Sequence, residues 1–135
     1  MTALTQARNT PYRPGRRLHD LIAAGAVIHT GALVCLNATG YLEPGSVSTA
    51  LRARGVAEVS ADNSGGADGD MSVGVTRGVY SFGNAAGDPV VQADVGNDCY
   101  ILDDQTVART SGTSTRSVAG KILDLDAGGV WVEIL

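Results

Sequence analysis

The sequence predicts an all-β protein: a small single-domain β-sandwich or β-barrel with an extended N-terminal arm. Three observations favour this class. Apolar residues repeatedly fall on alternate positions, eighteen glycines mark frequent turns, and no stretch has a convincing helical period. Alternation with a period of two is the pattern of a strand that buries one face. A chain of 135 residues has the length of one domain and can bury a real core.

The stretch from Met71 to Leu102 organises this prediction. Its first part is predicted to be one long strand, because apolar residues fall on alternate positions, interrupted by Arg77, with small residues between them; the apolar set is Met71, Val73, Val75 and Val79. Tyr80 and Phe82 then add bulk to the face of the small residues. Residues 98–102 are nearly apolar on both faces, which is typical of a strand covered on both sides.

Shorter strands are expected on either side of this stretch. We interpret Leu18–Ile28 as strand-like, because Gly25 and the Val27–Ile28 pair disfavour a helix. Turn residues flank further candidate strands. In Arg52–Ser60, small apolar residues alternate with polar ones as far as Val59, so we predict a strand with one face in water. The other predicted strands are 32–36 and 41–42, which form a hairpin, and 106–108.

The C-terminal part predicts a second hairpin. Val118–Asp126 and Val130–Ile134 are joined by a three-residue loop that contains two glycines. Simple alternation puts Leu123 and Leu125 on one face of the first strand. On the second strand it puts Trp131 and Glu133 on the wet face, where an aromatic residue suggests a contact surface. Trp131 and Glu133 are therefore candidates for an oligomer interface; the alternative is that an arm or loop of the same chain covers Trp131.

Residues 1–17 differ in charge from the rest, which we take as the body, residues 18–135. The arm holds four arginines and no acid, whereas the whole chain has a net charge of −4 and a pI of about 4.9. Two prolines in the arm exclude a continuous helix. We predict an arm that orders on an acidic partner through Arg8, Tyr12, Arg13, Arg16 and Arg17. The alternatives are a disordered tail and a nucleic-acid arm, although Tyr12 stands without a repeated aromatic–basic pattern.

The two cysteines, Cys35 and Cys99, both lie in apolar runs. They read as buried free thiols, and a disulfide would need oxidising conditions and a close approach of the two Cα atoms. The Asp- and Gly-rich stretch 62–70 lacks the spacing of an EF-hand calcium loop, so we interpret it as a solvated loop. We expect no metal and no cofactor.

The sequence offers little for catalysis. His19 and His29 are the only near-neutral bases, and no nucleophile, zinc-protease or phosphate-loop motif is present. The acid pairs Asp103–Asp104 and Asp124/Asp126 could mimic catalytic carboxylates. Acidic residues in turns and on the water-facing side of strands are more often simply solvated. We therefore expect no enzyme. The longest apolar run, Leu21–Ile28, is too short to span a bilayer, and no signal-peptide pattern precedes it.

The order of several segments resembles a family, the small capsid decoration, or cement, proteins of tailed bacteriophages. The resemblance covers roughly residues 25–135. It rests on the segments 31–37 with 40–41, 77–82 with 86–90, 97–108, 119–120 and 128–132. The arm matches least well.

The resemblance implies a structural virion protein. Such a protein binds the outer surface of the phage major capsid protein lattice, stabilises the head by cross-bridging capsomers, and commonly forms a homotrimer. It implies assembly in the host cytoplasm, a place on the outside of the capsid, and neither direct nucleic-acid nor membrane binding. Two other classes remain open: a glycan- or host-surface-binding module, which would need more clustered aromatics, and a head–tail or tail subunit.

Overall fold

Strands make up almost all the regular structure. The computed structural model describes residues 2–11 and 13–135. Within these residues it has twelve strands and a single 3-10 turn, η1 (Gln92–Asp94), so the predicted all-β class is confirmed. The strands are β1 (Arg17–Leu21), β2 (Val27–Ile28), β3 (Leu33–Leu36), β4 (Leu42–Pro44), β5 (Arg52–Ala57), β6 (Ala61–Asp62), β7 (Ser72–Thr76), β8 (Gly78–Asn84), β9 (Asp98–Ile101), β10 (Thr106–Ala108), β11 (Val118–Asp126) and β12 (Gly129–Ile134).

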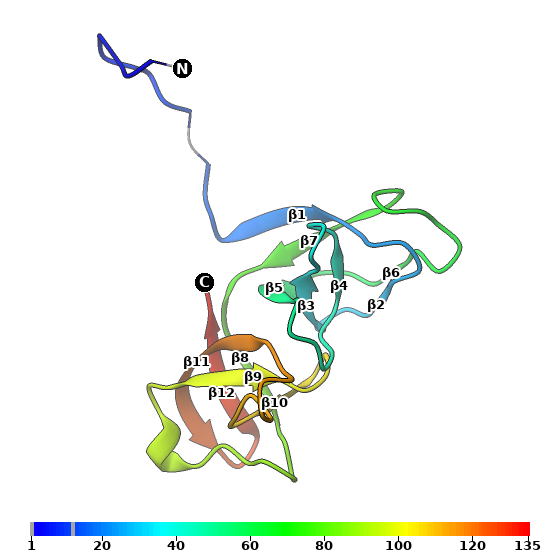
Figure 1. The fold of residues 1–135 in the computed structure, drawn as a ribbon, viewed down its shortest axis with the longest axis vertical. Helices are drawn as coiled ribbons and strands as arrows, with labels where there is room; N and C mark the ends of the chain where they lie inside the picture. The colour runs from blue at the N-terminus through cyan, green and yellow to red at the C-terminus, as the bar shows by residue number, and fades with distance from the viewer. Residues whose placement is uncertain (1, 12) are drawn as a thin grey trace.

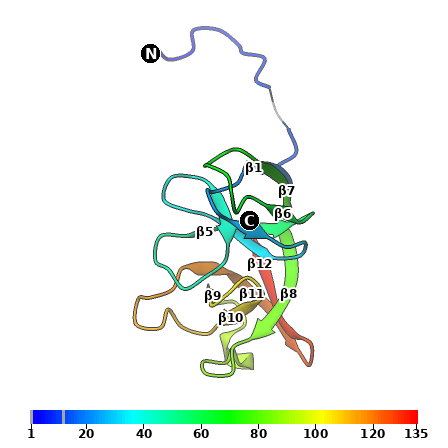
Figure 2. The same cartoon turned by 90° about the vertical axis from the view of Figure 1, so that its right-hand side faces the viewer.

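The strands form two layers of different topology. The N-terminal half builds a five-stranded sheet in the order β1-β7-β5-β3-β4, beside the small β2-β6 pair. The C-terminal half closes into a barrel in the order β10-β8-β12-β11-β9. Figure 1 shows the sheet next to the arm and the barrel below it, and Figure 2 shows β8 running from one to the other. The open choice between sandwich and barrel is thus resolved for this half: it is a barrel.

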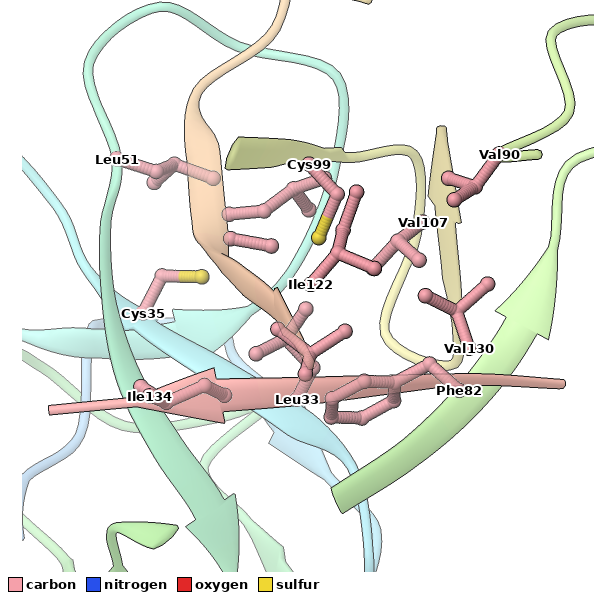
Figure 3. Close-up of a cluster of buried hydrophobic side chains, with 13 residues drawn as sticks. Leu33, Cys35, Leu51, Phe82, Val90, Cys99, Val107, Ile122, Val130 and Ile134 are labelled. Atoms are coloured by element: carbon pink, nitrogen blue, oxygen red, sulfur yellow. The ribbon is translucent and has the colours of Figure 1, made fainter. Parts of the chain in front are cut away.

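β3 belongs to the cores of both layers. Leu33 and Cys35 pack in the barrel core, where Phe82, Ile122 and Val132 also lie (Figure 3). Val34 and Leu36 face the other way and pack with Val73 and Val75 in the sheet core. Because successive side chains of a strand point to opposite faces, a four-residue apolar run serves two cores at once. The two layers therefore form one small domain.

The predicted alternation of residues 71–82 holds, but the buried side changes at Arg77. Val73 and Val75 are buried in the sheet, whereas Val79 is 43% exposed and Phe82 is buried in the barrel. The chain leaves the first sheet at Arg77 and enters the barrel at Gly78, so the inward direction shifts from odd to even positions. The expectation of one long strand is corrected to two strands in different sheets.

Two β-bulges alter predicted faces. The β11–β12 register shifts between Ile122 and Asp124, so Ile122 is buried and Leu123 is 44% exposed. The prediction that Leu123 and Leu125 share a face is wrong, because a bulge inserts an extra residue and moves Leu123 outward. The connecting loop also has two residues rather than three, since Gly129 already pairs with Asp126.

The second bulge lies at Arg54. Val34 pairs with Gly55 and Cys35 with Ala53, so Arg54 is left over in β5. Its guanidinium binds both carboxylate oxygens of Asp20, at 2.8 and 3.0 Å. β5 ends at Ala57, and Val59, which the sequence placed in the strand, is 55% exposed outside it.

Two other expectations are refined. The strand-like segment Leu18–Ile28 is divided into β1 and β2 by a turn at Gly25, whose φ of 75° suits glycine. Cys35 and Cys99 are buried free thiols, which confirms that prediction over a disulfide. The hairpin of β3 and β4 is confirmed.

The bulge predicts unequal costs at two adjacent residues. Ile122→Ala should lower the free energy of unfolding by about 2–5 kcal/mol, because it opens a cavity in the barrel core. Leu123→Ala should change it by about 0.5 kcal/mol or less, since that side chain is largely in water. Urea unfolding followed by Trp131 fluorescence measures both. Equal costs would contradict the bulged register.

The buried thiols predict a loss of stability at alkaline pH. Burial raises the pKa of Cys35 and of Cys99 from 9.0 to about 12, and the charge of Glu43 adds to the effect at Cys35. The folded state therefore keeps protons that the unfolded chain loses, and stability falls between pH 9.0 and about 12. Each thiol contributes a slope of at most about 1.4 kcal/mol per pH unit. In the Cys35→Ala/Cys99→Ala variant, unfolding followed across this range should show a flatter decline; an unchanged slope would contradict the assignment.

Candidate functional site

The N-terminal arm runs away from the body. Figures 1 and 2 show it leaving the start of β1 as an extended chain. Arg8 and Arg13 are exposed, and Arg8 Nη1 donates a hydrogen bond to Thr10 Oγ1, at 2.8 Å, within the arm. Tyr12, which we predicted to contact a partner, lies outside the described residues. The guanidinium groups of the distal arm thus lie in solvent, away from the body.

The root of the arm is fixed by Arg77. Its Nε and Nη2 donate to the carbonyl oxygen of Gly15 at 3.0 and 2.7 Å, and its backbone N–H donates to Arg16 O at 2.8 Å. Arg16 Nε in turn donates a longer hydrogen bond to Arg77 O, at 3.4 Å. Carbonyl oxygens carry no net charge, so both guanidinium groups keep their full positive charge beside one another.

A shallow groove of about 370 Å³ opens at this root. Its walls are mostly apolar and come from the arm root, the junction between β7 and β8, and the barrel: Gly15, Arg16, Arg77, Gly78, Ile134 and Leu135. The barrel strands β8 and β12 meet there, because Ile134 pairs with Gly78. The arrangement sets two cations at the rim of an apolar surface, which suits an acidic segment that also carries an apolar side chain.

Arg17 differs from the other predicted arm residues. It opens β1 and forms an ion pair with Glu58 at 2.8 Å, with its side chain 75% exposed. An exposed pair of this kind adds little stability. Arg17 is thus engaged in the sheet, whereas the boundary between arm and body at residue 17 stays a prediction.

Charge compensation is uneven along the described chain. Five ion pairs form there: Arg17–Glu58, Arg54–Asp20, Arg109–Asp94, Arg116–Asp88 and Lys121–Asp98. Nine of the fourteen acidic side chains therefore stay outside ion pairs, and all nine belong to the body. Among the arginines that the structure leaves without a carboxylate, Arg8, Arg13, Arg16 and Arg77 gather on the arm and its root. The molecule has a cationic end and an acidic body.

Trp131 and Glu133, the oligomer candidates, lie on the outer face of the barrel and are half-buried. The indole N–H of Trp131 donates to Asp126 Oδ2 at 2.8 Å. Glu133 stands opposite Val79 on one side and Lys121 on the other. Trp131 is thus partly accessible on this face, and Val79 and Leu123 on the neighbouring strands are exposed. The hydrogen bond to Asp126 is a feature that sequence spacing alone did not suggest.

The described residues contain no cluster of three or more potential metal ligands. His19 Nε2 lies 2.8 Å from Ser72 Oγ on neighbouring strands, and both groups are exposed. A polar groove near Tyr100 contains Arg109 and Lys121, but each of these cations is already paired with an aspartate. In the described part of the chain, no helix has the length and apolar character needed to cross a membrane.

Comparison of the chain with known proteins gives no match: no protein-family profile, no curated protein and no solved structure matches it. Function is therefore inferred from the arm, its root, the distribution of charge and the sequence resemblance of residues 25–135.

The Trp131–Asp126 contact predicts a fluorescence change in acid. The indole hydrogen bond, with further bonds from the backbone N–H groups of Gly128 and Gly129, holds the pKa of Asp126 below its ordinary value. Protonation of Asp126 should weaken the bond and shift the emission of the single tryptophan, with a midpoint below that of an ordinary aspartate. Asp126→Asn keeps an oxygen acceptor that does not titrate, so its emission should stay level over the same range. A transition that persists in this variant would contradict the assignment.

Proposed function

We propose that this chain is a structural virion protein that binds the outer surface of a phage major capsid protein lattice and cross-bridges neighbouring capsomers. The observation that carries the proposal is the exposed cationic arm on a compact acidic β body. Arg8 and Arg13 make no contact with a carboxylate in the described residues, so their charge is available to an acidic surface. The resemblance of residues 25–135 to decoration proteins supplies the identity of that surface.

Cross-bridging explains why modest contacts would be sufficient. A standard protein interface buries about 800 Å² on each partner. A subunit whose body rests on one capsid protein and whose arm lies on the next binds the second at a high effective concentration. Each contact can then be weak, while the two together hold the capsomers against outward pressure. The protein acts by adhesion and carries out no reaction.

The body suits this role because it is rigid where the arm joins it. The arm root is tied to Arg77, which lies between the sheet and the barrel, so a pull on the arm is transmitted to both layers. The face around Trp131 is the proposed contact between copies in a homotrimer, on the outside of a capsid assembled in the host cytoplasm.

Removal of residues 2–11 tests the role of the arm. We expect the truncated chain to keep its melting temperature, because these residues do not pack on the body, and to bind shells of the encoding phage at least about tenfold more weakly. Bound protein is measured after the shells are sedimented. A full-length Arg8→Lys variant, matched to the one arginine that the truncation removes, keeps the charge and should retain most of the binding.

Two outcomes would contradict parts of the proposal. Unchanged occupancy of the truncated chain on shells would remove the arm from the mechanism. Absence of the chain from purified mature heads would remove the function itself.

A further inference from the structure

The two arginines at the rim of the arm-root groove keep hydrogen-bond donors for a ligand. Arg77 uses Nε and Nη2 to hold Gly15 O, and Arg16 uses Nε for one long bond to Arg77 O. No hydrogen bond or ion pair among the described residues uses Arg77 Nη1 or either terminal nitrogen of Arg16. Because a guanidinium has five N–H donors in a planar fork, both side chains can bind an acceptor without giving up their present contacts.

Two glycines leave the space beside these guanidinium groups open. A Cβ added to Gly15 would lie 3.3 Å from Arg77 Nη2, and a Cβ added to Gly78 would lie 3.6 Å from Arg16 Nη2. Any larger residue at either position would therefore place its side chain in the groove, next to a cation. With glycine at both positions, the groove stays hollow beside both charges.

The rest of the groove is apolar. Ile134 is buried where β12 pairs with Gly78, whereas the neighbouring Leu135 is 82% exposed. The volume of about 370 Å³ lies within the range of small-ligand sites, roughly 300–1,000 Å³. An apolar side chain of a ligand that enters here would be removed from water against Ile134 and Leu135.

The charge around the groove fits an anionic ligand. Arg16 and Arg77 take part in none of the five ion pairs of the described chain, and Arg13 precedes them in an arm that has no acid. Glu58, the acid that contacts the start of β1, is already paired with Arg17 at 2.8 Å. Carboxylates bind arginine through short, charge-assisted hydrogen bonds. The groove thus matches a ligand that has an apolar group and carboxylates beside it.

We propose that this groove is a docking site for a short acidic segment of a partner protein, in which carboxylates flank one apolar side chain. The apolar side chain lies against Ile134 and Leu135, and the flanking carboxylates bind Arg16 and Arg77. Successive side chains of an extended segment point to opposite sides, so the neighbours of an inward-pointing residue are directed toward the rim. The contact is of the kind in which clustered arginines recognise an acidic motif.

The identity of the partner, the major capsid protein, rests on the proposed function. The groove adds to that function a contact made by the rigid body, because Arg77 fixes the root between the sheet and the barrel. The arm leaves the body at the same place, so an acidic segment bound in the groove continues along the arm toward Arg13 (Figure 1). Groove and arm therefore read one continuous stretch of the partner.

The first experiment uses peptides and the full chain, without shells. The probe is acetyl-Gly-Asp-Leu-Glu-Gly-amide, and NMR follows the backbone N–H signals of Gly15, Gly78 and Leu135 during its titration. We expect these signals to shift with a dissociation constant of about 1 mM or lower. Two matched peptides should bind at least about fivefold more weakly: Gly-Asn-Leu-Gln-Gly, which lacks the charges, and Gly-Asp-Gly-Glu-Gly, which lacks the apolar side chain, both with the same blocked ends.

The second experiment changes the groove. Arg16→Gln, which loses only one long hydrogen bond within the chain, should weaken binding of the probe at least about fivefold and lower the occupancy of shells. Arg52→Gln is the matched control: Arg52 is exposed, donates to Asn37 O at 3.0 Å and lies outside the groove, so its loss removes the same charge with little effect on binding. Leu135→Ala should also weaken binding, and its exposed side chain makes it a second variant that folds. Melting temperatures check that each variant is folded.

Three results would overturn the proposal: no shift of the groove signals with the probe up to its solubility limit, equal binding of the uncharged peptide, or a shift with decanoate but not with the probe, which would assign the groove to a free amphiphile. These failures are distinct from failure of the proposed function. A chain that occupies shells but does not bind the probe keeps its function and loses this site. A chain that binds the probe but is absent from mature heads keeps the site and loses the capsid protein as its partner.

Discussion

The burial of β3 on both faces is the constraint on which the rest of the structure depends. Its four residues alternate between two cores, so neither layer can form its interior without the same short segment. The backbone adds to this coupling: Leu33 N–H donates to Asp104 O in the barrel at 2.8 Å, and Leu33 O accepts the N–H of Gly45 at 2.9 Å. A chain with only six aromatic residues thereby obtains two cores from one set of aliphatic side chains. We expect the layers to unfold together, as a single small domain does.

This coupling determines how charge can be used. Five ion pairs form among the described residues, and the bidentate Arg54–Asp20 pair is the least exposed of them, with side chains 29% and 11% exposed. At the arm root, guanidinium groups meet backbone carbonyls instead, which fixes their position without cancelling their charge. The result is a rigid body with an acidic surface and a cationic end. Separated charge of this kind orients a protein toward a partner and raises the rate of encounter.

The sequence pattern predicted individual strands better than it predicted how those strands assemble. Alternation located β5, β7, β11 and β12 and the half-buried position of Trp131, because a strand that buries one face must alternate. It could not divide residues 33–36 between two cores, since a run that is apolar on both faces looks the same whichever layers cover it. It also missed the bulges at Arg54 and Leu123, because an inserted residue is detected only against its partner strand. The arm was visible from its charge, but its attachment to Arg77 joins positions 62 residues apart.

The choice of arginine over lysine fits the proposed role in adhesion. Lys121 is the only lysine, so nine of the ten cations are arginines, including every cation of the arm and its root. A guanidinium stays charged at any pH a folded protein meets, and its planar fork of donors binds carbonyl and carboxylate oxygens in fixed geometry. At Arg77 that fork holds the root through Gly15 O, and on the arm the same group is left open to an acidic surface. The positive side of any contact made by the arm is therefore constant with pH, so a change in its strength with pH must come from carboxylates on the surface it meets.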